Sequence, residues 1–197
     1  MLIRGLITFA FFSVDAYVPL ALIGWRGIDA SAAGIVLTVA TLTWTAGAWV
    51  QARYVARFGA GRFVTAGFAL VLVAIAVLAP VLRPDVPVIV ASIAWGIGGL
   101  GMGLGYAAIT LIVLAEAPPD GQGAATAALQ LSDVLGTALG TGSAGAVIAF
   151  ATQAGQPAWV GLAGAFSSGA LVALVGLGLS VRLHRPAARI RTAIEAR

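Results

Sequence analysis

The chain has 197 residues, of which 60% are apolar and only 9% are charged. Soluble domains carry about 25% charged residues and keep much of their surface in water, so this composition excludes a soluble fold. The mean hydropathy of +1.03 places the chain among integral membrane proteins, and the absence of Cys excludes disulfides and thiolate metal sites.

Charged residues divide the sequence at intervals that match the length of membrane-spanning helices. A spanning helix needs about 20 mostly apolar residues, and the segment TQAGQPA breaks the last long apolar run. The pattern predicts an all-α integral membrane fold. Its six transmembrane helices are expected near 5–23, 31–51, 62–80, 87–115, 123–150 and 159–181, and a basic tail with a short helix from about Pro186 is expected over 182–197.

The first predicted helix carries Asp15, Tyr17 and Pro19 within its apolar run. Asp15 lies near the middle of the span, where an ionised carboxylate is costly, so we expect the protonated carboxyl to be favoured. Pro19 cannot donate to the carbonyl of Asp15, which predicts a kink there. A proton-coupled carrier needs such a carboxyl, but a hydrogen bond between helices and a tolerated proline would explain the same residues.

The turn expected between the second and third helices is rich in arginine, with Arg53, Arg57 and Arg62. Nucleic-acid binding needs a broader basic surface, so no nucleic-acid partner is expected. With six spans, every arginine except Arg26 and Arg83 lies on the side of the two termini. Basic loops remain in the cytoplasm, which predicts cytoplasmic termini and contact of the turn with lipid headgroups.

The fourth helix is rich in glycine, which favours close packing or bending of helices. Its main candidates for packing are Gly99, Gly101, Gly103 and Gly105. The segment 96–101 formally matches a dinucleotide-binding motif, but it lies inside an apolar run without the required preceding strand, so we reject that interpretation.

In the fifth helix, polar residues including Gln130, Asp133 and Thr137 recur at steps of three or four and share one face. Asp133 is expected near the bilayer midplane, without a basic residue at that depth. Either it exchanges protons or it joins helices as a hydrogen-bonded acid. Gly136 and Gly140 add a small-residue track for packing.

The third and sixth helices have few polar residues and are expected to lie at the periphery of the other four. No enzyme, cofactor or metal site is expected, because His184 is the only histidine and no acidic cluster has ligand spacing.

In order, these segments resemble the C-terminal six-helix half of a major facilitator superfamily (MFS) transporter, and they are similar to bacterial drug:proton antiporters. The resemblance covers nearly the whole chain and depends on the first helix, on GLGMGLGYAAITLIVLAEAPPDGQGAATAALQLSDVLGTALG, and on the turn from Gly47 to Arg62. That turn is similar to the family's loop motif through Gly47, Arg57, Gly59 and Arg62, with Arg53 between them. Gln51 stands where the motif has Asp.

The resemblance implies two inverted three-helix repeats, a site between two halves, and transport by alternating access in a bacterial inner membrane. We expect drug efflux, with a lipid bilayer, a small-molecule substrate and a second six-helix half as partners. That half would be a covalent N-terminal half, a separate chain or a second copy. The alternative is a non-transporting membrane scaffold or pseudo-transporter subunit.

Overall fold

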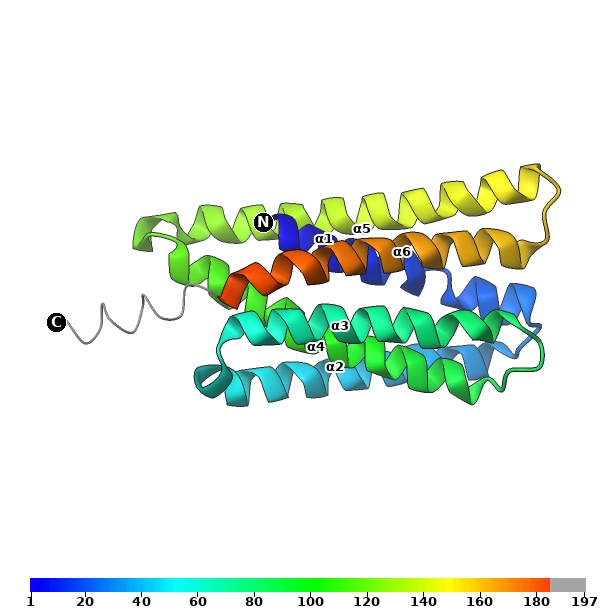
Figure 1. Cartoon of the computed structure of the whole chain (residues 1–197), viewed down its shortest axis with the longest axis horizontal. Helices are drawn as coiled ribbons and strands as arrows, with labels where there is room; N and C mark the ends of the chain where they lie inside the picture. Colours follow the sequence, from blue (N-terminus) through cyan, green and yellow to red (C-terminus); the bar gives the residue numbers. More distant parts are fainter. Residues whose placement is uncertain (185–197) are drawn as a thin grey trace.

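The computed structural model describes residues 1–184, and over that range its regular elements are all helices. Six helices are long and apolar enough to span a membrane, which confirms the expected number (Figure 1). The short helix expected from about Pro186 lies outside the described residues.

The first span is made of two pieces, an α-helix followed by a π-helical segment. The bounds of the elements are α1 Leu2–Asp15, η1 Leu20–Trp25, α2 Ala30–Phe58, α3 Ala60–Leu78, η2 Ala79–Leu82, α4 Ile89–Glu116, η3 Pro119–Gly121, α5 Gln122–Gln153, α6 Ala158–Ser180 and η4 Val181–His184. Each of the six spans therefore falls on an apolar run of the sequence.

The connection between α2 and α3 is shorter than the sequence indicates. We expected a turn from about residue 51, but α2 continues to Phe58 because no helix-breaking residue precedes Gly59. Gly59 has φ 81°, a conformation that favours glycine, and it alone separates the two helices. Arg53 and Arg57 therefore lie on the last turns of α2 rather than in a loop.

The six helices pack as two groups of three. α4 packs along both α2 and α3, whereas α1 packs along α5 and α6, and α3 meets α6 between the groups. The helices approach one another most closely at glycines, which have no side chain. A Cβ added to Gly101 would lie 2.8 Å from the Gly67 carbonyl oxygen, so the backbones of α3 and α4 nearly touch.

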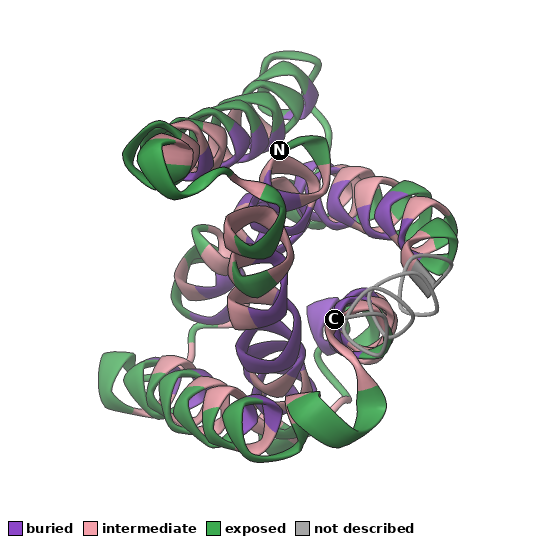
Figure 2. Cartoon of the chain, turned by 90° about the vertical axis from the view of Figure 1, so that its left-hand side faces the viewer, coloured by how far each residue is buried: buried purple, intermediate pink, exposed green. Residues whose placement is uncertain are grey.

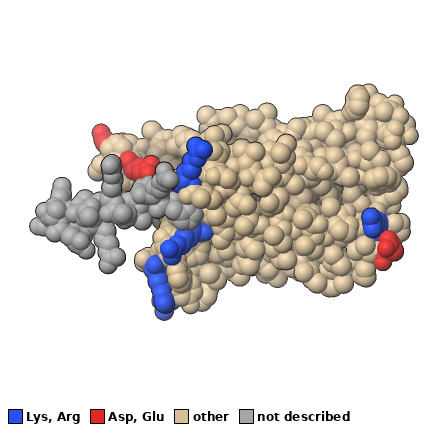
Figure 3. All heavy atoms as spheres, viewed as in Figure 1, with Lys and Arg blue, Asp and Glu red and all other residues tan. Residues whose placement is uncertain are grey.

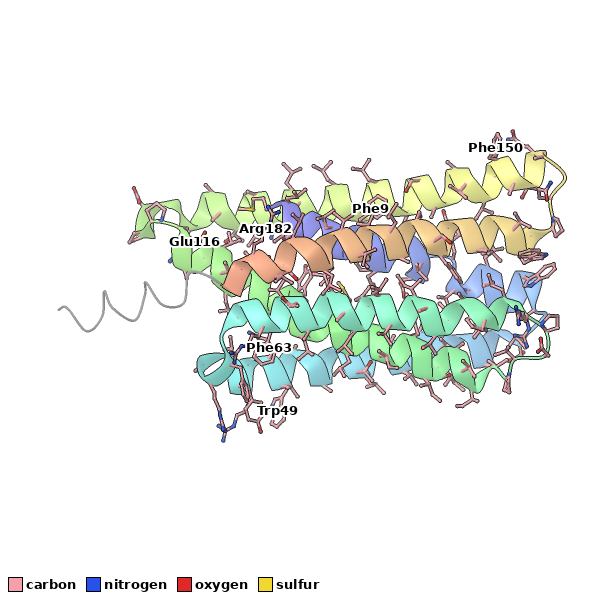
Figure 4. All side chains as sticks on the ribbon, viewed as in Figure 1. Phe9, Trp49, Phe63, Glu116, Phe150 and Arg182 are labelled. Carbon is pink, nitrogen blue, oxygen red and sulfur yellow. The ribbon has the colours of Figure 1, made fainter. Side chains whose placement is uncertain are left out.

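Burial is uneven among the helices. The core contains Trp95, Phe68 and Phe166, whose side chains are fully buried, but α2 and α5 bury the smallest share of their length (Figure 2). This differs from the expectation that the third and sixth helices are the outer ones. Within residues 1–184, α3 and α6 pack against each other, whereas one face of α2 and of α5 is uncovered, and Trp49 and Phe150 point away from the bundle there (Figure 4).

On the face that Figure 3 shows, charged side chains lie only at the two ends of the bundle. Figure 3 shows basic and acidic side chains at both ends of one face and an uncharged band between them. Such a band is the surface that lipid tails require, since a charge in the hydrocarbon region is costly. The structure therefore has the form of a multi-pass membrane protein, while the cytoplasmic location of the termini stays a prediction.

Candidate functional site

A buried ion pair joins α1 to α5. The Nε atom of Arg4 lies 2.5 Å from Oδ1 of Asp133, and Nη2 donates to Oδ2 at 2.9 Å. Only 4% of the Arg4 side chain and 20% of the Asp133 side chain are exposed. Two parallel bonds between a guanidinium and a carboxylate form a strong and directional contact.

The expectation that no basic residue shares the depth of Asp133 is therefore wrong. The first turns of α5 extend past the start of α1, as Figure 1 shows. Counted from the start of α5, Asp133 lies deep in its helix, but Arg4 places it level with the first turn of α1. Asp133 thus lies near one end of the bundle.

Helix α4 completes the surroundings of this pair. The hydroxyl of Tyr106 donates to Oδ2 of Asp133 at 2.8 Å, and the guanidinium carbon of Arg4 lies 3.0 Å from the centre of the Tyr106 ring. Arg4 also donates from Nη1 to the Tyr106 carbonyl at 2.6 Å and to the Thr110 hydroxyl at 3.1 Å. The network therefore links α1, α4 and α5, which belong to both groups of helices.

Asp15 occupies a different kind of environment. It ends α1, halfway along the first span, and Oδ1 accepts a hydrogen bond of 2.7 Å from Nε1 of Trp95 in α4. Within residues 1–184 the ion pair of Arg4 is the only one, so Asp15 has no cation beside it. The two aspartates do not form a carboxylate pair, because eleven residues of α-helix separate Arg4 from Asp15, or about 16 Å.

An aromatic cluster lies between the two carboxyls. Phe11 stacks on Trp95 with ring centres 4.8 Å apart, and it meets Trp44 edge to face at 5.7 Å. Trp44 in turn meets Tyr106 at 5.6 Å. These rings come from α1, α2 and α4 and form a continuous row from the Asp15 donor to the Asp133 donor.

Near Asp15 the first span changes its geometry. The α-helix ends at Asp15, and after Pro19 the chain continues as the π-helical η1, in which the Arg26 N–H donates to the Ala21 carbonyl five residues back. Pro19 removes one ladder bond, which accounts for the break. The hydroxyl of Tyr17 donates to the Thr141 carbonyl of α5 at 2.8 Å.

The structure does not gather all the predicted polar residues around one point. Gln130 is exposed and Thr137 is partly buried. Both lie on α5, at a distance from Asp15. Thr8 of α1 meets the α5 backbone at Gly136, where an added Cβ would overlap Gly5 and Thr8. The polar face of α5 is therefore divided between the contact with α1 and the uncovered side.

The loop-motif residues have separate positions. A Cβ on Gly47 would lie 2.6 Å from the Leu100 carbonyl oxygen, so this glycine brings α2 against α4. Gln51 is 2% exposed, and its amide nitrogen has no hydrogen-bond partner. Arg53, Arg57 and Arg62 are exposed, and Arg57 lies over the ring of Phe58.

The glycines of α4 face two neighbours. Gly99 and Gly103 lie against the backbone of α2, and Gly101 and Gly105 lie against α3 at Gly67. On α5, a Cβ on Gly140 would lie 2.7 Å from the Phe9 carbonyl oxygen of α1. Each of these glycines stands where two helices approach most closely.

Sequence reasoning missed four participants: Arg4, Tyr106, Thr110 and Trp95. Arg4 resembled an orienting charge at the end of a span, although it is buried. A signal was present, since an arginine and an aspartate within apolar helices require each other. The residues that the structure describes contain no group of three or more His, Cys, Asp or Glu that could hold a metal ion.

No protein-family model matches the sequence, and no curated protein matches it either.

Proposed function

We propose that this chain acts as one six-helix half of an MFS-type secondary transporter in a bacterial inner membrane, with both termini in the cytoplasm. It exports a small amphipathic compound in exchange for protons by alternating access. The six apolar helices and the resemblance noted above support the proposal, and Asp15 is the observation that carries it.

Asp15 has the properties that a proton-coupling carboxyl needs. It lies halfway along a span and beside a break in its helix, has one neutral donor in Trp95, and is half-buried. Without a cation to hold the ionised form, the carboxyl can bind and release a proton as its surroundings open or close. The partly exposed ring of Trp44, which contacts Phe11, offers an aromatic surface for an amphipathic substrate.

The packing supports a partner half. Exchanging α1 with α4, α2 with α5 and α3 with α6 turns one packed group into the other, as two inverted repeats of three consecutive helices would. The uncovered face of α2 carries Thr38, Thr41 and Thr45, and that of α5 carries Gln130, beside apolar residues such as Leu42 and Leu139. Mixed polar and apolar faces of this kind suit a cavity wall and a helix interface better than they suit lipid.

In this proposal Asp133 has a second role. Arg4 and Tyr106 already satisfy its carboxylate with three hydrogen bonds, which is the arrangement of a structural link between helices. We therefore assign the proton first to Asp15, and assign the Arg4–Asp133 pair to holding α1 against α5 during the transport cycle.

The proposal is tested in everted membrane vesicles from bacteria that express the chain together with the gene products encoded beside it. An amphipathic cation such as ethidium is added to vesicles with an acidic interior, and proton release is followed with a pH-sensitive dye. We expect Asp15→Asn to abolish substrate-driven proton release and Asp133→Asn to reduce it.

The matched control is Asp85→Asn, which changes an exposed carboxylate in the loop between η2 and α4. It should behave as the unchanged protein. Proton release that survives Asp15→Asn would contradict the assignment, and the absence of any substrate-driven release would contradict transport itself.

One observation favours the alternative of a non-transporting scaffold. The carboxylate of Asp133 is fully paired, which is the arrangement of a structural contact. A scaffold should purify alone as a stable monomer, whereas a transporter half should form dimers or co-purify with a second six-helix chain.

A further inference from the structure

An apolar groove lies between α3 and α6 at the end of the bundle that carries the loop between η2 and α4. Its volume is about 480 Å³. The walls are mostly apolar and include Ile75, Ala76, Ala79, Trp159 and Phe166. Among its polar members, the Ser167 hydroxyl donates to the Ala163 carbonyl within α6, so it needs no ligand.

Arg83 is the cation of this groove. It lines the groove and is exposed, and within residues 1–184 its guanidinium forms no hydrogen bond or ion pair, although its backbone is bonded to Pro80 and Val86. The nearby Arg26 is different, because its guanidinium donates to the carbonyls of Val81, Pro84 and Val86. Of these two arginines, only Arg83 remains available to an anion.

The segment that carries Arg83 is held in place. Trp25 donates from Nε1 to the Leu82 carbonyl at 2.7 Å, and Arg26 bonds to carbonyls on both sides of Arg83. These contacts join the end of η1 to η2 and to the loop after it, and they fix the backbone at the groove. Trp25 and Trp159, both lining residues, add indole rings of the kind found where a membrane meets water.

We propose that this groove binds one phospholipid of the surrounding bilayer, with an acyl chain between α3 and α6 and its phosphate on Arg83. The apolar walls match a hydrocarbon chain, and a guanidinium is the side chain best suited to a phosphate. Asp85, two residues on, does not line the groove and forms no ion pair with Arg83 within the described residues. The proposal requires only membrane insertion and does not depend on transport.

The first test is native mass spectrometry of the full chain, purified, delipidated and titrated with dioleoylphosphatidylglycerol. We expect one lipid to bind more tightly than the rest. Arg83→Gln should weaken that step about fivefold, since a basic residue near a membrane surface contributes about 1 kcal/mol toward a lipid phosphate. Arg53→Gln, which changes an exposed arginine on α2, is the matched control and should leave this step unchanged.

The second test separates the acyl chain from the phosphate. Ala76→Phe fills the groove from an exposed position and should remove the tight step, whereas Val73→Phe, on α3 but outside the groove, should not. Dioleoylglycerol has the acyl chains without the phosphate. It should therefore bind the unchanged protein no more tightly than it binds the Arg83→Gln variant.

Three results would overturn the proposal. Equal losses in Arg83→Gln and Arg53→Gln would mean unspecific attraction of lipid to charge. Tight binding that survives Ala76→Phe would place the lipid elsewhere. Competition by inorganic phosphate alone at the same concentration would mean a free-anion site rather than a lipid site.

Discussion

The two carboxyls inside this bundle have opposite surroundings. Asp133 receives two bonds from Arg4 and one from Tyr106 and lies level with the first turn of α1. Asp15, halfway along the first span, receives one bond from Trp95 and has no cation beside it within the described residues. The comparison shows that neighbouring helices, rather than the apolar sequence around each carboxyl, decide whether it meets a cation or a single neutral donor.

The largest expected effect comes from removing the cation of the paired site. Arg4→Ala leaves the Asp133 carboxylate partly buried without its partner, and breaking a buried pair costs about 3 kcal/mol or more. Thermal unfolding in detergent should show a large fall in Tm. The double variant Arg4→Met with Asp133→Leu should recover much of it, because apolar side chains can replace such a pair. Equal instability of both variants would contradict the attribution of the loss to the unpaired Asp133 carboxylate.

The next effect concerns the donor of the unpaired site. Trp95→Phe keeps a buried ring but removes the hydrogen bond to Asp15, which costs roughly 1–3 kcal/mol when a buried acceptor is left unsatisfied. In vesicle assays the variant should also change the pH at which transport is half-maximal. Trp49→Phe alters an exposed indole on α2 and is the control. An unchanged pH profile would mean that Trp95 does not influence the proton site.

A smaller effect distinguishes the hydrogen bond from Tyr106 to Asp133 from those of Arg4. Tyr106→Phe removes one hydrogen bond while Arg4 keeps both of its own, so we expect a loss of about 1 kcal/mol in stability. Chemical unfolding of the purified protein measures it. A loss as large as that of Arg4→Ala would mean that the tyrosine, rather than the ion pair, holds the three helices together.

The smallest effect comes from a carboxyl outside the spans. The backbone N–H of Ser31 donates to Asp29 at 2.8 Å at the start of α2 and lowers the pKa of this exposed carboxyl. Its contribution to stability is therefore present above its unfolded pKa of about 3.9 and is lost as the pH falls through the lower folded value. Asp29→Ala should remove this acid-dependent part, as thermal unfolding at pH 6 and pH 3 would show. If Tm of Asp29→Ala fell between these pH values by as much as Tm of the unchanged protein, Asp29 would make no pH-dependent contribution to stability.

The sequence alone determined the all-helical class, the number of helices long and apolar enough to span a membrane, and the presence of carboxyls within them. These features depend on composition and spacing along the chain, since a bilayer requires apolar runs of a certain length whatever their partners are. The glycines of the fourth and fifth helices were also recognisable as packing candidates, because small residues are what close helix contacts require.

Only the tertiary structure decided what each carboxyl meets. The pairing of Arg4 with Asp133 depends on how far α5 extends past α1, and the bond from Trp95 to Asp15 depends on how α4 lies against α1. Helix offsets of this kind come from side chains distant in sequence that pack together. Depth counted along one helix therefore placed Asp133 too far from any cation, and the contact between helices corrected it.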